Sequence, residues 1–221
     1  MSQQTSPDSS RQSDQASSRE SGRESGTESS QESGSESGQE SSRQWSAGTP
    51  HEGDERPDQL PDQQILGATL HAELLRRGLT LATAESLTGG ALGDLVSASP
   101  GASETYLGGV VSYATSVKVD VLGVRPETVE SAGVVSAACA REMARGVREL
   151  VGADWAVSTT GVAGPTEQEG QAVGTVFIGV AGPDGVVAHE LHLDGDRAQI
   201  RERACSAAAS SVLEQVVGAG D

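Results

Sequence analysis

Lysine occurs once in this 221-residue chain, at a position that marks a candidate for acid–base chemistry. Fourteen of the 15 basic residues are arginines, and Lys118 is the exception. Arginine keeps its proton at any accessible pH, whereas a lysine amine can be neutralised by its surroundings and then accept a proton. Lowering the pKa of a lysine to near neutrality requires a dry or cationic pocket. Lys118 is therefore a candidate general base.

A candidate nucleophile lies in the segment AESLTGG, where a predicted strand ends at Ser86 and two glycines begin a predicted helix. Gly89 and Gly90 let the backbone approach a ligand closely, and the free amides of a helix start stabilise anions and oxyanions. We expect Thr88 and these two glycines to bind substrate. The alternative is structural, since Ser86 or Thr88 could simply cap the helix.

Tyr113 and Lys118 follow a second strand, in the segment GGVVSYATSVK. Ligand crevices form at strand ends in α/β sheets, so this segment and Ser86 are expected to meet there. A serine beside a neutral lysine, with a tyrosine that holds or relays the proton, can hydrolyse amides without histidine. The chain has no SxxK motif, so the fold would have to assemble the pair.

Two further segments are candidates for substrate binding. The loop after a buried strand contains Gly161, Ala163 and Gly164. Because these side chains are small or absent, the loop backbone can contact a ligand directly. A plain tight turn is the alternative. Arg197 begins the last predicted helix and could hold a phosphate or carboxylate, while Asp196 could cap that helix.

These segments require an alternating arrangement of helices and strands. Helices are expected from Pro61 to about Gly78, from Thr88, through Lys118 to about Gly123, from Pro126, from Ser136 to about Leu150 and from Asp196 to about Gly218. Strands are expected at 79–85, from about Gly109, at 156–161, and in a hairpin at 174–181 and 186–193. This order predicts an α/β fold, a three-layer α/β/α sandwich with a mixed sheet. Neither the Rossmann nor the P-loop glycine motif occurs.

The first 60 residues differ in composition from the rest. A four-residue x-Glu-Ser-Gly/Ser unit repeats six times across 19–42 and offers no apolar face to bury. We expect residues 1–60 to be a disordered acidic tail and 61–221 to form one domain. Residues 1–63 hold five arginines and 13 acidic residues, so they carry −8 of the net charge of −17. The tail is either a solvated extension or an interaction arm.

Composition also excludes several classes of function. A net charge of −17 without clustered basic residues argues against nucleic-acid binding. Cys139 and Cys205 form no CxxC motif and are expected to be buried on helices, and His189 and His192 point to opposite faces of a strand. No metal or cofactor is therefore expected. The chain has neither an apolar run of membrane length nor a signal-peptide core after Met1, which predicts a cytoplasmic protein.

An ordered set of segments resembles the CinA C-terminal family, whose stand-alone bacterial members are nicotinamide-nucleotide amidases (PncC-like). The matching stretches are TAESLTGG, GGVVSYATSVK, LGV, GVVS, STTGVAGP, VGTVFIGV and GDR. The resemblance implies hydrolysis of the carboxamide of nicotinamide mononucleotide to nicotinate mononucleotide and ammonia, in pyridine nucleotide salvage. It also implies a metal-free mechanism in which Ser86 attacks, Lys118 transfers the proton and Tyr113 orients the pair.

The chain departs from the family pattern in two places. Family members commonly carry a Gly-Gly and a Lys-Pro where residues 166–172 read TEQEGQA, and larger relatives have an N-terminal molybdopterin-binding-like domain where this chain has the repeat tail. An amidase acting on another substrate is therefore an alternative, and so is a catalytically idle nucleotide-binding or interaction module linked to competence and DNA damage. We also expect a homo-oligomer.

Overall fold

The computed structural model describes residues 61–219, with side chains from Gln63 onward. The predicted disordered tail lies outside the described residues. The helices are α1 (Pro61–Arg77), α2 (Ala91–Ser97), α3 (Thr115–Asp120), α4 (Pro126–Ala132), α5 (Ala137–Val151) and α6 (Arg197–Gly218), with a short 3-10 turn, η1 (Ala102–Glu104). The strands are β1 (Leu81–Glu85), β2 (Tyr106–Val111), β3 (Trp155–Gly161), β4 (Thr175–Gly182) and β5 (Gly185–His192).

The strands form one mixed sheet in the order β2-β1-β3-β4-β5. Strands β2, β1 and β3 are parallel, whereas β4 runs antiparallel to both β3 and β5. Every residue of β1 and β4 is buried, as expected for strands covered on both faces. The edge strands β2 and β5 alternate between partly buried and exposed residues for most of their length.

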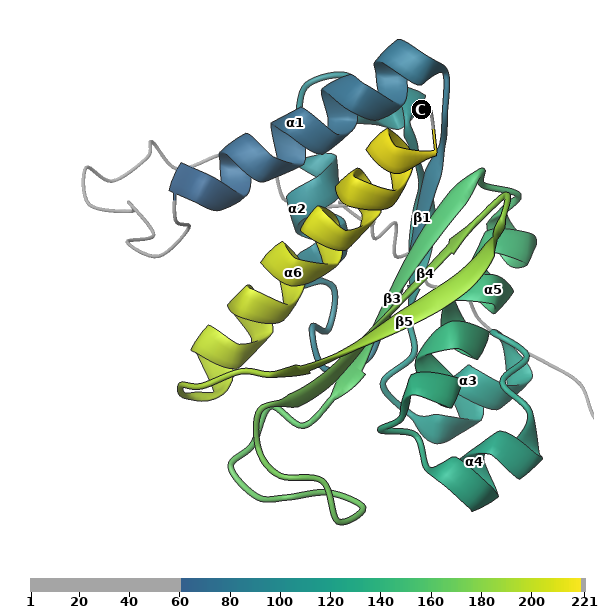
Figure 1. The fold of residues 1–221 in the computed structure, drawn as a ribbon, viewed down its shortest axis with the longest axis vertical. Coiled ribbons are helices and arrows are strands. Elements are labelled where there is room, and N and C mark those ends of the chain that lie inside the picture. Colours follow the sequence, from purple (N-terminus) through teal and green to yellow (C-terminus); the bar gives the residue numbers. More distant parts are fainter. Residues whose placement is uncertain (1–60, 220–221) are drawn as a thin grey trace, which may run out of the picture. The chain divides into compact units, whose positions relative to one another are not determined.

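Helices cover both faces of the sheet, which confirms the predicted three-layer α/β/α sandwich (Figure 1). Helices α1, α2 and α6 pack together over one face, where leucines, valines and alanines make up most of the core. Helix α5 packs on the opposite face and contacts all five strands, with α4 against it. The two free cysteines are buried as predicted, Cys139 on α5 and Cys205 on α6.

The helix starts follow the capping residues that the sequence contains. The Ser136 side chain accepts a hydrogen bond from the Cys139 amide at 3.1 Å, and Asp196 forms a capping box with Gln199. Pro126 occupies the first turn of α4. Three predicted helix boundaries are thereby confirmed within one or two residues.

Two predicted boundaries are wrong. Helix α2 begins at Ala91 instead of Thr88, because Gly89 and Gly90 have φ angles of 60° and 101°, which right-handed helices do not contain. Strand β2 begins at Tyr106 instead of Gly109, because a register shift beside Leu81 lets pairing with β1 start three residues earlier.

None of the helices in 61–219 combines the length and the hydrophobicity that crossing a lipid bilayer requires.

Candidate active site

Three parallel strands end at the same edge of the sheet, and a serine follows two of them. Ser86 comes directly after β1, and its amide donates to the Thr159 carbonyl oxygen of β3 at 2.9 Å. Ser112 comes directly after β2, and its amide donates to the Glu85 carbonyl oxygen at 2.7 Å. The Ser86 backbone is thus held between the two neighbouring strands. Figure 1 shows this edge beside α3 and the loop after β3.

Helix α3 brings Lys118 to this edge, as the sequence predicted. The Lys118 Nζ atom lies 3.0 Å from Ser86 Oγ and donates to the carbonyl oxygen of Ser112 at 2.6 Å. Only 1% of the lysine is exposed. A buried amine in contact with a serine hydroxyl is the arrangement that a Ser/Lys mechanism requires.

Burial lowers the pKa of Lys118, because an ammonium loses its hydration in the protein interior. The negative charge of the Glu169 carboxylate opposes this shift in part, as a Cys139 thiolate also would. Burial also raises the pKa of Cys139 to about 11, so its thiol is neutral at pH 7 and extends the apolar wall behind the amine. The site therefore shifts the equilibrium of Lys118 from the ammonium toward the unprotonated amine.

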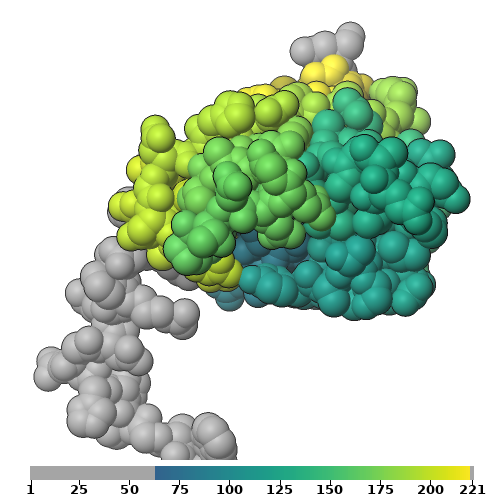
Figure 2. All heavy atoms as spheres, turned by 90° about the horizontal axis from the view of Figure 1, so that it is seen from below, coloured from purple at the N-terminus to yellow at the C-terminus, as the bar shows by residue number. Residues whose placement is uncertain are grey.

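A cavity of about 290 Å³ opens in front of Ser86 and Lys118. Its walls include the other predicted site residues Tyr113, Gly161, Ala163, Gly164 and Arg197. Its remaining lining residues are Leu87, Thr115, Val134, Val135, Thr160, Val162, Thr166, Glu167 and Gln168. Figure 2 shows this end of the molecule, where the green segment after β3 lies beside the teal segment that contains α3 and α4.

Tyr113 lies on the cavity, where its hydroxyl contacts Arg197 instead of the Ser86–Lys118 pair. Its side chain is 62% exposed, and its hydroxyl accepts a hydrogen bond from Arg197 at 2.8 Å. Arg197 also donates to the Gly164 carbonyl oxygen at 2.6 Å. Within 61–219, Tyr113 forms no hydrogen bond with Ser86 or Lys118. The tyrosine and the arginine instead join two walls at the mouth of the cavity.

The helix start that was predicted to bind an anion is already occupied by a carboxylate. Glu85 accepts hydrogen bonds from the amides of Gly90, Leu92 and Gly93 at 2.8, 3.0 and 2.8 Å. The Gly89 amide donates to the Ser86 carbonyl oxygen. Neither glycine therefore has a free amide for substrate. The sequence signal that was missed is the acidic residue at the end of β1, six residues before α2, which complements the helix dipole.

Thr88 does not line the cavity either. Its side chain is fully buried, and its hydroxyl lies 2.7 Å from the Thr159 hydroxyl of β3. This contact ties the turn after Ser86 to the centre of the sheet. The predicted role of Thr88, Gly89 and Gly90 as substrate ligands thus becomes a role in shaping the backbone around Ser86.

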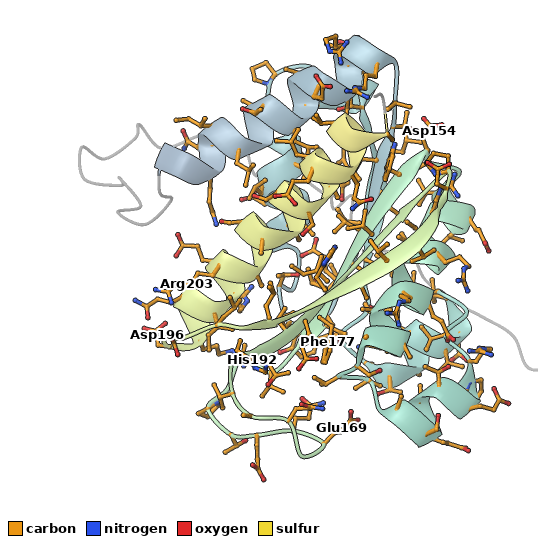
Figure 3. The ribbon with its side chains drawn as sticks, viewed as in Figure 1. Asp154, Glu169, Phe177, His192, Asp196 and Arg203 are labelled. Atoms are coloured by element: carbon orange, nitrogen blue, oxygen red, sulfur yellow. The ribbon has the colours of Figure 1, made fainter. Side chains whose placement is uncertain are left out.

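The segment that departs from the family pattern borders the site. Thr166, Glu167 and Gln168 line the cavity. The next two residues reverse the chain at φ angles of 53° and 73°, and the Glu169 carboxylate accepts a hydrogen bond from the Val135 amide at 3.2 Å. Figure 3 labels Glu169 at the tip of this loop.

Residues 63–216 match a family model described as the CinA C-terminal domain. This chain belongs to that family. It is 48% identical over 157 residues to a CinA-like protein of Frankia casuarinae, covering 71% of this chain and 36% of that relative. It is 45% identical over 139 residues to a CinA-like protein of Synechocystis, covering 62% of this chain and 33% of that relative. The matched region thus spans about a third of these curated relatives.

Solved structures of CinA relatives share the fold. The competence/damage inducible protein CihA of Agrobacterium tumefaciens superposes with a TM-score of 0.68 at 32% identity, covering 70% of this chain and 96% of that chain. A CinA superfamily protein of Escherichia coli superposes with a TM-score of 0.66 at 30% identity, covering 71% and 94%. The described CinA domain therefore corresponds to nearly all of each of these proteins.

Proposed function

We propose that this CinA domain hydrolyses the carboxamide of nicotinamide mononucleotide, giving nicotinate mononucleotide and ammonia. The observation that carries the proposal is the buried Lys118 amine, 3.0 Å from Ser86 Oγ at the wall of a cavity. The resemblance of the TAESLTGG and GGVVSYATSVK segments to nicotinamide-nucleotide amidases supports the choice of substrate.

In the first step Ser86 Oγ attacks the amide carbon while its proton passes to the Lys118 amine. An unprotonated lysine has one lone pair, and the hydrogen bond that Nζ donates to Ser112 helps to turn this lone pair toward Ser86. Burial lowers the pKa of Lys118 and so raises the fraction of free amine that can take the proton.

The negative charge that develops on the amide oxygen requires hydrogen-bond donors. The Leu87 and Thr88 amides donate no hydrogen bond within the described part of the chain, and Leu87 lines the cavity directly after Ser86. A backbone amide next to a nucleophile is a common oxyanion donor. We assign this role to the Leu87 amide.

In the second step the Lys118 ammonium returns its proton to the amide nitrogen, the C–N bond breaks and ammonia leaves. The resulting Ser86 ester is attacked by a water molecule, whose proton Lys118 accepts and then gives back to Ser86 Oγ as the C–O bond breaks. The sum is one amide and one water converted to one acid and one ammonia. The chemistry uses a single acid–base group throughout.

Arg197 is the proposed contact for the phosphate of the nucleotide. It uses two of its nitrogens on Tyr113 and Gly164, and a guanidinium has five N–H donors, so donors remain for a ligand. Glu167 lines the same cavity and carries the opposite charge, which suits the cationic pyridinium ring.

We further propose that the protein works in the cytoplasm as a homo-oligomer.

The decisive experiment is ammonia release from nicotinamide mononucleotide by purified protein, with Ser86→Ala as the control. Stoichiometric ammonia and nicotinate mononucleotide from the wild type alone would support the proposal. Binding of the nucleotide without ammonia would identify an idle module. Ammonia from a different amide only would retain the mechanism and replace the substrate.

A further inference from the structure

An arginine on α6 contacts the carbonyl oxygens of the two residues that follow Ser86. The Arg201 Nε donates to the Leu87 carbonyl oxygen at 3.1 Å, and its terminal nitrogen donates to the Thr88 carbonyl oxygen at 2.6 Å. These residues are 114 and 113 positions away in sequence, so the contact exists only in the folded domain. Arg201 is not among the residues that line the cavity.

The backbone segment that Arg201 contacts is the turn Ser86–Gly89, which a hydrogen bond closes. The Gly89 amide donates to the Ser86 carbonyl oxygen at 3.2 Å, which fixes the peptide group between Ser86 and Leu87. Gly89 has a φ of 60°, and a Cβ placed there would lie 3.4 Å from the Arg201 guanidinium. The glycine thus provides the left-handed conformation, and a Cβ there would only reach ordinary van der Waals contact with the arginine.

The orientation of the amides follows from the planarity of the peptide. In a trans peptide the carbonyl and the N–H point in opposite directions, so a group whose oxygen faces α6 directs its N–H away from α6. The Ser86 carbonyl oxygen is occupied by the Gly89 amide, and the N–H of the same peptide group belongs to Leu87. Displacing the Leu87 and Thr88 carbonyls would therefore open the turn that directs the Leu87 amide.

We propose that Arg201 is a positioning residue, which holds the Ser86–Gly89 turn so that the Leu87 amide can receive the oxyanion. This inference builds on the proposed amide hydrolysis. Arg201 does not touch the reacting atoms and acts only through the carbonyls of Leu87 and Thr88.

The position of Arg201 on its helix supports this role. Arg197 and Arg201 are four residues apart on α6, so they lie on the same face. Arg197 contacts Tyr113 and Gly164 at the mouth of the cavity, while Arg201 contacts the nucleophile turn. The first two turns of α6 thus contact two separate parts of one site, the cavity mouth and the turn after Ser86. The Asp196 capping box fixes where that helix begins.

Substitutions can separate positioning from general stability. Arg201→Lys keeps the charge, but a lysine lacks the planar guanidinium group that donates to both carbonyl oxygens. Arg201→Met removes both hydrogen bonds and fills much of the same volume. Arg203→Met is the matched control: Arg203 lies on the same helix, is exposed and donates to the Asp194 carbonyl oxygen outside the site (Figure 3).

The experiment measures kcat and KM for nicotinamide mononucleotide well below each variant's unfolding temperature. A lost oxyanion donor typically costs about 100-fold or more, so a misplaced one should lower kcat by about 10-fold to 100-fold in Arg201→Met and Arg201→Lys. KM should change by less than about 3-fold, since the residue does not contact substrate. Equal kcat values for Arg201→Met and Arg203→Met would overturn the proposal.

A second readout does not depend on the substrate. Hydrogen exchange of the Gly89 amide, followed by NMR, reports opening of the turn directly. Faster exchange in Arg201→Met than in the wild type, with no change in Arg203→Met, is the expected result. Unchanged exchange would overturn the role of Arg201 in holding the turn. If the wild type released no ammonia while Arg201→Met still opened the turn, the proposed function would fail and the structural part of this inference would stand.

Discussion

Lys118 and Ser86 are 32 residues apart in sequence, and their side chains meet at 3.0 Å. The contact depends on the parallel pairing of β1 and β2, which places both strand ends at one edge of the sheet. It also depends on α3, which returns the chain so that the amine reaches the Ser112 carbonyl oxygen. Because the lysine is buried, its pKa is lowered, and this shift makes the amine better suited to accept the Ser86 proton.

The first prediction concerns the pH dependence of kcat/KM. A base must be unprotonated, so activity should rise with pH through the pKa of Lys118 in the free enzyme. Burial lowers that pKa from its ordinary value of 10.5, so the rise should occur below pH 10.5. Glu169→Gln should move the rise to still lower pH, because the Glu169 carboxylate stabilises the ammonium, while the amide oxygen can still accept from Val135. A shift to higher pH in Glu169→Gln would contradict this account.

Tyr113→Phe separates the predicted role of the tyrosine from its observed contact. The Tyr113 hydroxyl pairs with Arg197, so its loss should release the arginine and raise KM by about 3-fold to 10-fold with a smaller change in kcat. If Tyr113 instead relayed a proton between Ser86 and Lys118, its loss would lower kcat strongly and change KM less. A kcat as low as that of Lys118→Ala would therefore restore the role that the sequence suggested.

Parts of this site could be predicted from sequence because they depend on residue type and on local order. The single lysine, the serine at a strand end and the capping residues Ser136 and Asp196 are visible in the printed chain. The contacts of Glu85 and Arg201 were not predicted. The Arg201 contacts reach carbonyls more than 100 residues away and depend on how the layers pack. The Glu85 contacts are local, but they form only because the left-handed Gly89 and Gly90 turn the chain back toward the end of β1.

Removal of residues 1–56 is the third prediction. The repeat in 19–42 offers no apolar face to join a core, so the truncated protein should keep its melting temperature within about 2 °C and its turnover within about 2-fold. Thermal unfolding and ammonia release from both forms provide the test. A clear drop in melting temperature would mean that the segment packs on the domain.

Chelation provides the fourth prediction. The part of the chain that the structure describes contains no group of three or more histidine, cysteine or acidic side chains placed to hold a metal ion. The proposed mechanism needs no metal, so kcat should be unchanged after exhaustive treatment with EDTA. Lost activity that returns on adding a divalent cation would reveal a site that this account lacks.

The central claim is that Lys118 is the general base, and comparing Lys118→Arg with Lys118→Ala tests it most directly. Arginine keeps the positive charge and much of the length but does not release its proton, so both variants should lose at least about 100-fold in kcat. Lys118→Arg should bind substrate better than Lys118→Ala. Ser86→Ala should be equally inactive, and the Ser86→Ala/Lys118→Ala double variant should lose little more, because the two residues act as one unit.

The measurement is kcat for nicotinamide mononucleotide in all four variants, beside a binding assay that shows each one is folded. The account predicts that Lys118→Arg is as inactive as Lys118→Ala. A Lys118→Arg variant that retained a sizeable fraction of the wild-type rate would contradict it, because Lys118 would then contribute only its charge and another group would have to take the proton from Ser86.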